Sequence, residues 1–220
     1  IFDELFEMVR ALGFVNLHKL ETNVAVNVDA FTVIPREALD SDVDSMYQIR
    51  AGGMNVLNVV DSWISPVALA ELASESPWDM VLWPFQTMRE IEVLAPSRAD
   101  TASLELPSEW IDQLKVLNPR FVVPSSCQFT QEPWSWYRHR FFPISYAQFQ
   151  QEVEQALPEA RVVRLNPSVS VVVDENSLEL AAPLPWVTPV GEQDVDYRYD
   201  GSVAPPHTSE IARHFPAITP

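Results

Sequence analysis

An aspartate that closes an apolar run is the residue of this sequence best placed to do chemistry. Asp61 ends the stretch GGMNVLNVVDSW, residues 52–63, and a helical pattern follows it. Strands of α/β proteins present functional side chains at their carboxyl ends, where a carboxylate can hold a metal ion or a substrate. A short acceptor side chain at this place can instead cap the next helix, which is the commoner role. Both interpretations are open at this point.

A cysteine offers a second kind of chemistry. Cys127 follows the apolar run RFVVPSS, and His139 lies twelve residues further along the chain. A cysteine activated by a neighbouring histidine is the nucleophile of thiol enzymes. A single buried cysteine is more often an inert core residue. The cysteine–histidine pair is therefore one alternative, beside a structural role for Cys127.

The acidic run DSDVDS, residues 40–45, invites a calcium hypothesis. A calcium-binding EF-hand loop needs acidic groups at its first, third and fifth positions, a glycine at its sixth and a glutamate at its twelfth. The sixth position here is Ser45 and the twelfth is Ala51. The pattern favours a solvated turn before a strand.

The aromatic and basic run WSWYRHRFF, residues 134–142, resembles a platform for single-stranded nucleic acid. The chain, however, has 14 basic and 31 acidic residues and a formal net charge of -17, which repels phosphate backbones and anionic lipid. We therefore expect neither a nucleic-acid nor a membrane partner. We expect a loop whose rings pack on the core and whose Arg138 and Arg140 pair with acidic residues.

Composition indicates a globular protein, because the 220 residues are 47% hydrophobic. One cysteine excludes an internal disulfide framework and suits a reducing compartment. No run approaches the roughly 18 apolar residues of a membrane-spanning helix, and the chain does not open like a signal peptide. These features predict a cytoplasmic location.

The elements that position these residues follow from hydrophobic periodicity. Helical spacing predicts a helix at 3–12, and short β-branched runs between residues 14 and 60 predict a meander of strands. Later segments alternate between helices at 66–74, 107–117 and 145–157 and strands at 80–85, 120–124 and 160–165. This order predicts an α/β fold, a mixed β-sheet with covering helices, over residues 1–180. Residues 181–220 are rich in proline and predict an extended C-terminal tail.

The order of elements around Asp61 resembles the second half of the metallo-β-lactamase fold superfamily. Strands at 24–28, 31–34, 46–50 and 55–60 lead into NVVD, and helices then alternate with MVLWPF and RFVVPSS. The resemblance covers about residues 2–173 and rests on element order more than on motif. It implies half or more of an αββα sandwich, in which two similar halves pack face to face and metals lie in the groove between them.

The resemblance also implies site residues. The family's metal-bridging aspartate ends a strand after a glycine turn, where this chain has Asp61. The position of the last histidine ligand is occupied by Ser125 and Ser126, and these residues and Cys127 would line the groove. The family's H-x-H-x-D-H motif is absent from this chain. His207, in APPHTSE, is the candidate for a substitute donor from the tail, although an exposed tail histidine is the simpler interpretation.

A metal-dependent hydrolase of unknown substrate, with zinc or another divalent metal, is the function that this resemblance implies. One aspartate does not hold zinc, which needs about three or four donors. The remaining donors would lie on an N-terminal half outside this sequence. The alternative is a non-catalytic binding or assembly subunit that keeps only the scaffold. Half of a sandwich leaves one sheet face exposed, so we expect a partner surface for that half, a second copy of the chain or the folded-back tail.

Overall fold

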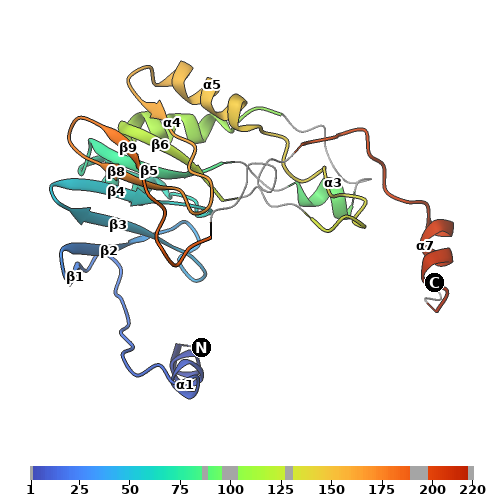
Figure 1. The fold of residues 1–220 in the computed structure, drawn as a ribbon, viewed down its shortest axis with the longest axis horizontal. Helices are drawn as coiled ribbons and strands as arrows, with labels where there is room; N and C mark the ends of the chain where they lie inside the picture. The colour runs from blue at the N-terminus through green and yellow to red at the C-terminus, as the bar shows by residue number, and fades with distance from the viewer. Residues whose placement is uncertain (1, 86–88, 96–103, 127–130, 189–197, 218–220) are drawn as a thin grey trace.

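A mixed seven-stranded sheet forms the centre of the protein. The structure, a computed structural model, describes residues 2–85, 89–95, 104–126, 131–188 and 198–217. The first strands pair antiparallel: β1 (Val26–Val28), β2 (Phe31–Glu37), β3 (Ser45–Ala51) and β4 (Met54–Asn58). The later strands continue the sheet in parallel with β4: β5 (Trp78–Pro84), β6 (Pro119–Ser125) and β7 (Arg161–Val162). The strand order follows the sequence from β1 to β7, as Figure 1 shows.

Three helices cover one face of the sheet: α2 (Pro66–Ala73), α4 (Ser108–Leu117) and α5 (Tyr146–Ala156). Their buried side chains form one core with alternate residues of the strands, including Leu57, Trp83 and Leu114. Local sequence sets the limits of α4 and α5. Ser145 caps α5 by accepting a hydrogen bond from the Gln148 amide at 3.2 Å. Asn118 ends α4 in a left-handed conformation, which asparagine tolerates.

A two-stranded hairpin covers part of the opposite face. Its strands are β8 (Ser170–Val173) and β9 (Leu178–Ala181), which pair antiparallel. Val171, Val173 and Leu178 pack against a second core that contains Met80 and Phe121 of β5 and β6. On the rest of this face, over β1 to β3, the side chains of Phe31 and Tyr47 are exposed.

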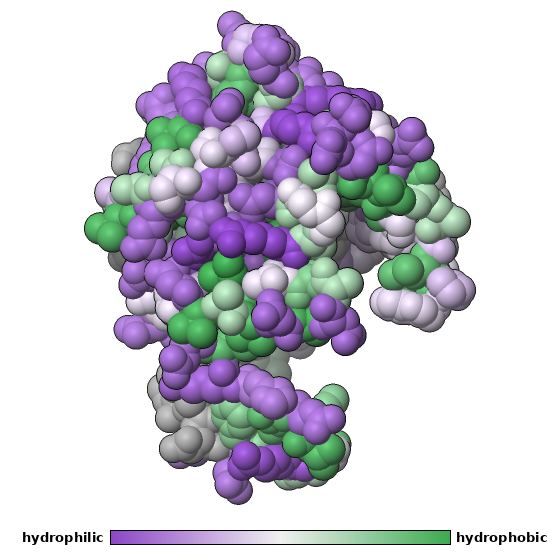
Figure 2. Space-filling view, turned by 90° about the vertical axis from the view of Figure 1, so that its left-hand side faces the viewer, coloured by the Kyte–Doolittle hydropathy of each residue, from purple (hydrophilic) through white to green (hydrophobic). Residues whose placement is uncertain are grey.

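Of the helices in the described residues, α1 (Phe2–Ala11), α3 (Glu90–Leu94) and α7 (Thr208–His214) lie outside this central body. Figure 1 shows α1 beyond the β1 edge of the sheet, α3 beyond the ends of the strands, and α7 further out still. Leu5, Met8 and Leu12 are exposed in and after α1, and Figure 2 shows hydrophobic side chains on this lobe at the bottom of the view. No helix in the described part of the chain is long and apolar enough to cross a membrane.

The α/β fold predicted from the sequence is confirmed, with its mixed sheet and the three covering helices. The predicted turn at 40–45 before a strand is also confirmed. The predicted meander between residues 14 and 60 begins later than expected, at β1, because residues 14–20 form no strand. The proline-rich tail is not extended throughout, since α7 lies within it. The division of the chain at residue 180 stays a prediction.

Candidate functional site

The carboxyl ends of the parallel strands form one edge of the sheet, where α/β proteins bind their ligands. Backbone hydrogen bonds fix this edge. The amides of Val59 and Val60 both donate to the Leu82 carbonyl oxygen, at 3.0 and 3.2 Å. The Phe85 amide donates to the Ser125 carbonyl oxygen at 3.0 Å, which joins the ends of β5 and β6. The three strand ends are therefore held in register beyond their last ladder pairs.

Two residues at this edge have a left-handed backbone conformation. Val60 has a φ of 52° and Ser126 a φ of 65°. The Ser126 hydroxyl donates a hydrogen bond to the Val60 carbonyl oxygen at 3.1 Å, so the two residues are linked across the edge. A positive φ in a β-branched residue is an outlier, and backbone strain of this kind clusters at functional sites. The sequence gives no signal for it, because valine is the last residue expected in this conformation.

Asp61 follows Val60 in an exposed turn. It does not cap α2, because the N-cap residue is Ser65, whose hydroxyl oxygen accepts from the Ala68 amide at 3.1 Å. The capping interpretation of Asp61 is therefore wrong. Within the described residues the Asp61 carboxylate makes no hydrogen bond or ion pair, so its acceptor oxygens face solvent at the sheet edge.

Asp61, Ser125 and Ser126 all lie at this edge. They are among the residues that the resemblance implies for the groove. The link is indirect, through the bond from Ser126 to the residue before Asp61. Ser125 is also satisfied locally, since its hydroxyl donates to the Val123 carbonyl oxygen at 3.3 Å. Cys127 lies outside the described residues, so its predicted place in the groove and its pairing with His139 stay predictions.

His207 is not brought to this edge. It immediately precedes α7, which Figure 1 shows on the far side of α3 from the sheet. Its ring Nδ1 lies 2.9 Å from the Ser209 hydroxyl oxygen, a contact within the tail. The two predicted metal ligands, Asp61 and His207, therefore lie apart in this structure.

The donor side chains of the described residues decide whether they can bind zinc by themselves. Zinc takes about four nitrogen, oxygen or sulfur donors in a tetrahedral arrangement. Within the part of the chain that the structure describes, no three histidine, cysteine, aspartate or glutamate side chains gather into such a group. Asp61 is a single donor, and the described residues by themselves do not fit a bound zinc ion.

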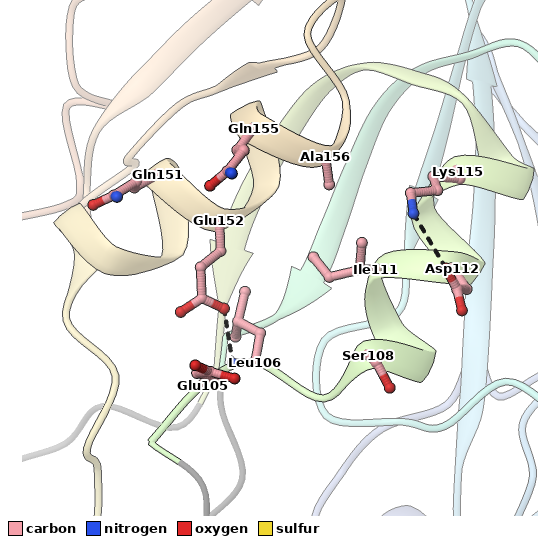
Figure 3. A pocket seen from close by; sticks show the side chains of 10 residues that line it. All are labelled: Glu105, Leu106, Ser108, Ile111, Asp112, Lys115, Gln151, Glu152, Gln155 and Ala156. Carbon is pink, nitrogen blue, oxygen red and sulfur yellow. Dashed lines mark hydrogen bonds and ion pairs between the residues drawn. The ribbon is translucent and has the colours of Figure 1, made fainter.

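A groove of about 650 Å³ lies between α4 and α5, as Figure 3 shows. Its polar groups bind one another. Glu152 accepts hydrogen bonds from the Leu106 amide at 2.9 Å and from the Gln148 side chain at 2.7 Å. The Lys115 ammonium lies 3.3 Å from the Asp112 carboxylate. The bond between Leu106 and Glu152 joins α5 to the segment that precedes α4, whereas the other two contacts each lie within one helix.

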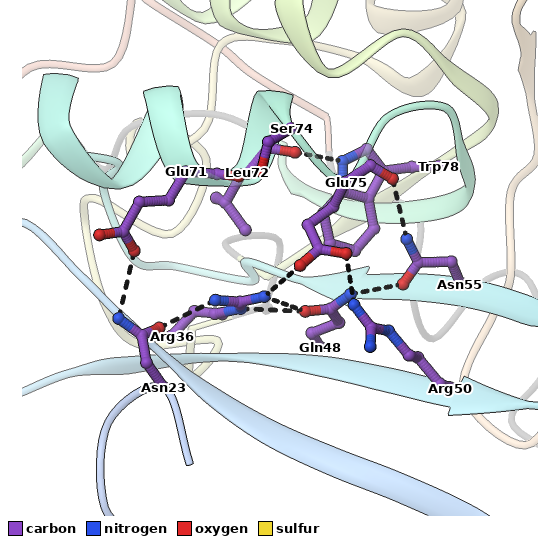
Figure 4. A network of polar contacts seen from close by, with 10 residues as sticks. All are labelled: Asn23, Arg36, Gln48, Arg50, Asn55, Glu71, Leu72, Ser74, Glu75 and Trp78. Atoms are coloured by element: carbon purple, nitrogen blue, oxygen red, sulfur yellow. Dashed lines mark hydrogen bonds and ion pairs between the residues drawn. The ribbon is translucent and has the colours of Figure 1, made fainter. Parts of the chain in front are cut away.

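A polar network on the helix-covered side of the sheet joins β2 and β3 to the end of α2 (Figure 4). Arg36 donates to the Gln48 side-chain oxygen at 2.9 and 2.6 Å and to the Glu75 carboxylate at 3.0 Å. Arg50 also binds Glu75, and fully buried Gln48 donates to Asn55 at 2.8 Å. Partial burial raises the pKa of Glu75, but the charges and hydrogen bonds of the two arginines outweigh it and hold the pKa below its usual 4.5. The mutual pairing of these groups indicates a structural lock.

A third cluster, here named the aromatic lobe, consists of α3 and residues 131–144 and 199–203. Phe141 and Phe142 are buried in it, and Trp136, Tyr137 and Tyr199 pack around them. The Glu92 carboxylate forms ion pairs with the Arg89 guanidinium at 3.2 Å and with the Arg140 guanidinium at 3.9 Å. The predicted pairing of Arg140 with an acidic residue is confirmed. The rings do not pack on the main core as predicted, because they form a cluster of their own and Trp134 is exposed, and Arg138 has no acidic partner within the described residues.

Comparison with known proteins gives likenesses of structure only. No protein-family model and no curated protein sequence matches the chain. Among solved structures, a diiron beta-hydroxylase from Streptomyces venezuelae is 17% identical with a TM-score of 0.47, over 72% of this chain and 35% of that one. A metallo hydrolase from the archaeon Ignicoccus hospitalis is 16% identical with a TM-score of 0.45, over 74% and 62%.

A protein of the metallo-β-lactamase superfamily from Thermotoga maritima is 13% identical with a TM-score of 0.39, over 68% of this chain and 72% of that one. The chain spans about a third of the length of the Streptomyces enzyme and less than two thirds of the archaeal one. The likeness concerns the arrangement of strands and helices.

Proposed function

We propose that the carboxyl edge of the parallel strands is one wall of the substrate groove of a metal-dependent hydrolase. The observation that carries the proposal is the linked pair of left-handed residues, Val60 and Ser126, directly beside the free carboxylate of Asp61. Holding a valine in this conformation costs about 1–2 kcal/mol, and the bond from Ser126 helps to maintain it. In this proposal the strained turn directs Asp61 out of the edge toward the groove.

The role of this chain in the proposed hydrolase is to position one carboxylate. A bound divalent metal would polarise the scissile bond and lower the pKa of its water. Since the described residues do not hold such an ion by themselves, its further donors would come from polypeptide outside them. No step of hydrolysis is assigned to the described residues beyond the placing of Asp61.

Metal analysis tests this proposal. The chain, expressed with any polypeptide that is encoded before it in its gene, is loaded with zinc, dialysed and assayed for bound metal. We expect bound zinc in the wild type, its loss in Asp61→Ala and its retention in Asp42→Ala. Asp42 is the matched control, because it is also an exposed aspartate in a turn. Equal zinc in all three proteins, or zinc in none, contradicts the hydrolase proposal.

A second candidate is a non-catalytic assembly subunit, and the uncovered half of the sheet favours it. The register places Val28 opposite Phe31 and Ile49 opposite Val56, on the face that the β8–β9 hairpin covers further along. On the uncovered part, Phe31 is 41% exposed and Tyr47 38%. Large exposed apolar patches mark interaction sites.

The occupant that we propose for this face is a second β-sheet on a partner polypeptide. The hairpin already extends a β layer over β5 and β6, and a partner sheet would continue that layer over β1 to β3. The charge substitution Phe31→Asp would abolish binding of the partner in a pull-down with any polypeptide that is encoded before this chain in its gene, whereas Val116→Asp, at an exposed position of α4, would not. A dimer of the chain alone that Phe31→Asp dissociates would assign the face to a second copy instead. Undiminished binding by Phe31→Asp contradicts both assignments.

A further inference from the structure

One turn of the aromatic lobe contains two shielded hydrogen-bond donors without partners among the described residues. Ser135 is 6% exposed, and its hydroxyl makes no hydrogen bond to any of them. The Nε of Arg138, three residues on, is shielded from solvent and also lacks a partner. The Arg138 amide donates to the Ser135 carbonyl oxygen at 3.1 Å, so both side chains leave the same tight turn. Buried polar groups are paired in the great majority of cases, and an unpaired one calls for an explanation, such as a missing ion.

The absence of an acidic partner for Arg138 is unexpected in this chain. Acidic residues number 31 against 14 basic ones, so a carboxylate is easily recruited. The shielded carboxylate of the lobe, Glu92, is engaged by Arg89 and Arg140. Hydrogen bonds from the hydroxyl and amide of Ser202 hold the pKa of Asp200 below its usual value, so this carboxylate is also engaged. A guanidinium that is kept free of carboxylates is available to an anion that comes from outside.

The position of the turn relates it to the strand edge. It lies on the connection from β6 to α5, and the Arg89 amide donates to the Phe141 carbonyl oxygen at 3.0 Å, which ties this connection to the one that leaves β5. Figure 1 shows α3 beyond the carboxyl ends of β4 to β6. The neighbours of Ser135 in the sequence, Trp134 and Trp136, line a hollow of about 530 Å³ that α7 closes on its other side. The lining of this hollow also includes Glu210 of α7, and it does not include Ser135 or Arg138 themselves.

We propose that Ser135 and Arg138 bind an oxyanionic group, phosphoryl or carboxylate, of the substrate. The Ser135 hydroxyl and the Arg138 guanidinium donate to its oxygens, and charge-assisted bonds of this kind are the strong ones in proteins. Arginine suits the task because its planar donors match the geometry of both groups. The assignment of the ligand as a substrate rests on the hydrolase proposal, whereas the binding of an oxyanion does not.

Anion titration of the metal-free chain tests the inference. Inorganic phosphate and acetate are titrated separately by calorimetry, in EDTA and at constant ionic strength. We expect saturable binding at one site, weakened about tenfold in Arg138→Met and less in Ser135→Ala. Arg161→Met is the matched control, because Arg161 is an exposed arginine on β7 and its removal changes the net charge equally. The anion that binds more tightly identifies the group as phosphoryl or carboxylate.

The inference is overturned if neither anion binds saturably, or if Arg161→Met weakens binding as much as Arg138→Met does. Circular dichroism and a urea unfolding curve check the fold of each variant. If Arg138→Met does not fold, Ser135→Ala still provides the test, because alanine fits the space of a buried serine and the variant should fold. Unchanged anion binding in Ser135→Ala then overturns the assignment. Since no metal is present, loss of the zinc site in the earlier experiment leaves this result unaffected, and the two proposals fail separately.

Discussion

The pairing of Glu75 with two arginines predicts a pH-dependent contribution to stability. Glu75→Gln removes the negative charge that binds Arg36 and Arg50 and keeps the shape of the side chain. Arg36 is 11% exposed, so its lost charge-assisted bond costs about 1.5–3 kcal/mol. Arg50 is 45% exposed, and solvent screening reduces its pair to about 0.2–1 kcal/mol. New bonds from the glutamine recover part of this, so we expect a loss of about 2 kcal/mol in the free energy of unfolding near neutral pH.

The sign of the pH dependence follows from the pKa of Glu75, which is lower in the folded chain than its usual 4.5. The contribution of ionised Glu75 to the free energy of unfolding is complete at pH values above its usual pKa. It is lost as the pH falls through the lower pKa that Glu75 has in the folded chain. Urea unfolding curves of wild type and Glu75→Gln should therefore differ near neutral pH and converge in acid. Glu71→Gln is the control, because exposed Glu71 binds only the Asn23 side chain in the network and should change stability by less than about 0.5 kcal/mol. The reasoning is refuted if wild type and Glu75→Gln have the same free energy of unfolding at neutral pH, or if their difference is as large in acid as at neutral pH.

Three further variants test the core, a helix cap and the sheet edge by urea unfolding and hydrogen exchange. Leu114→Ala should lower the free energy of unfolding by about 3 kcal/mol, because Leu114 is fully buried, and the exposed control Val116→Ala should change it little. Ser145→Ala should cost about 1 kcal/mol by removing the N-cap of α5, and an equal loss in exposed Ser108→Ala would contradict this assignment. Ser126→Ala should speed amide exchange at 59–62 without affecting that of α5, and unchanged exchange there would show that the bond to Val60 does not hold the edge.

The fold was largely predictable because its signals are local. Periodicity located the three covering helices. Ser145 caps α5, but the Gln148 side chain binds Glu152 and the Leu104 carbonyl oxygen and does not return to the Ser145 amide. The β8–β9 hairpin was missed because its strands are short and depend on packing against Met80 and Phe121. Residues 14–20 alternate like a strand but have no neighbour to pair with.

The candidate site was predictable only in part. The end of an apolar strand identified Asp61, and the order of elements placed Ser125 and Ser126 near it. The left-handed turn at Val60 could not be predicted, because valine disfavours it and tertiary contacts impose it. The unpartnered donors of Ser135 and Arg138 were equally hidden, since the sequence shows an arginine but not whether a carboxylate reaches it.

The central claim is that Asp61 faces a metal-binding groove, and an anomalous diffraction measurement tests it most directly. Crystals of the chain, together with any polypeptide that is encoded before it in its gene, would be soaked with zinc, and diffraction data would be collected at the zinc absorption edge. We predict an anomalous peak about 2.0–2.2 Å from an Asp61 carboxylate oxygen. A fully occupied peak elsewhere with none at Asp61, or no zinc peak at all, contradicts the account.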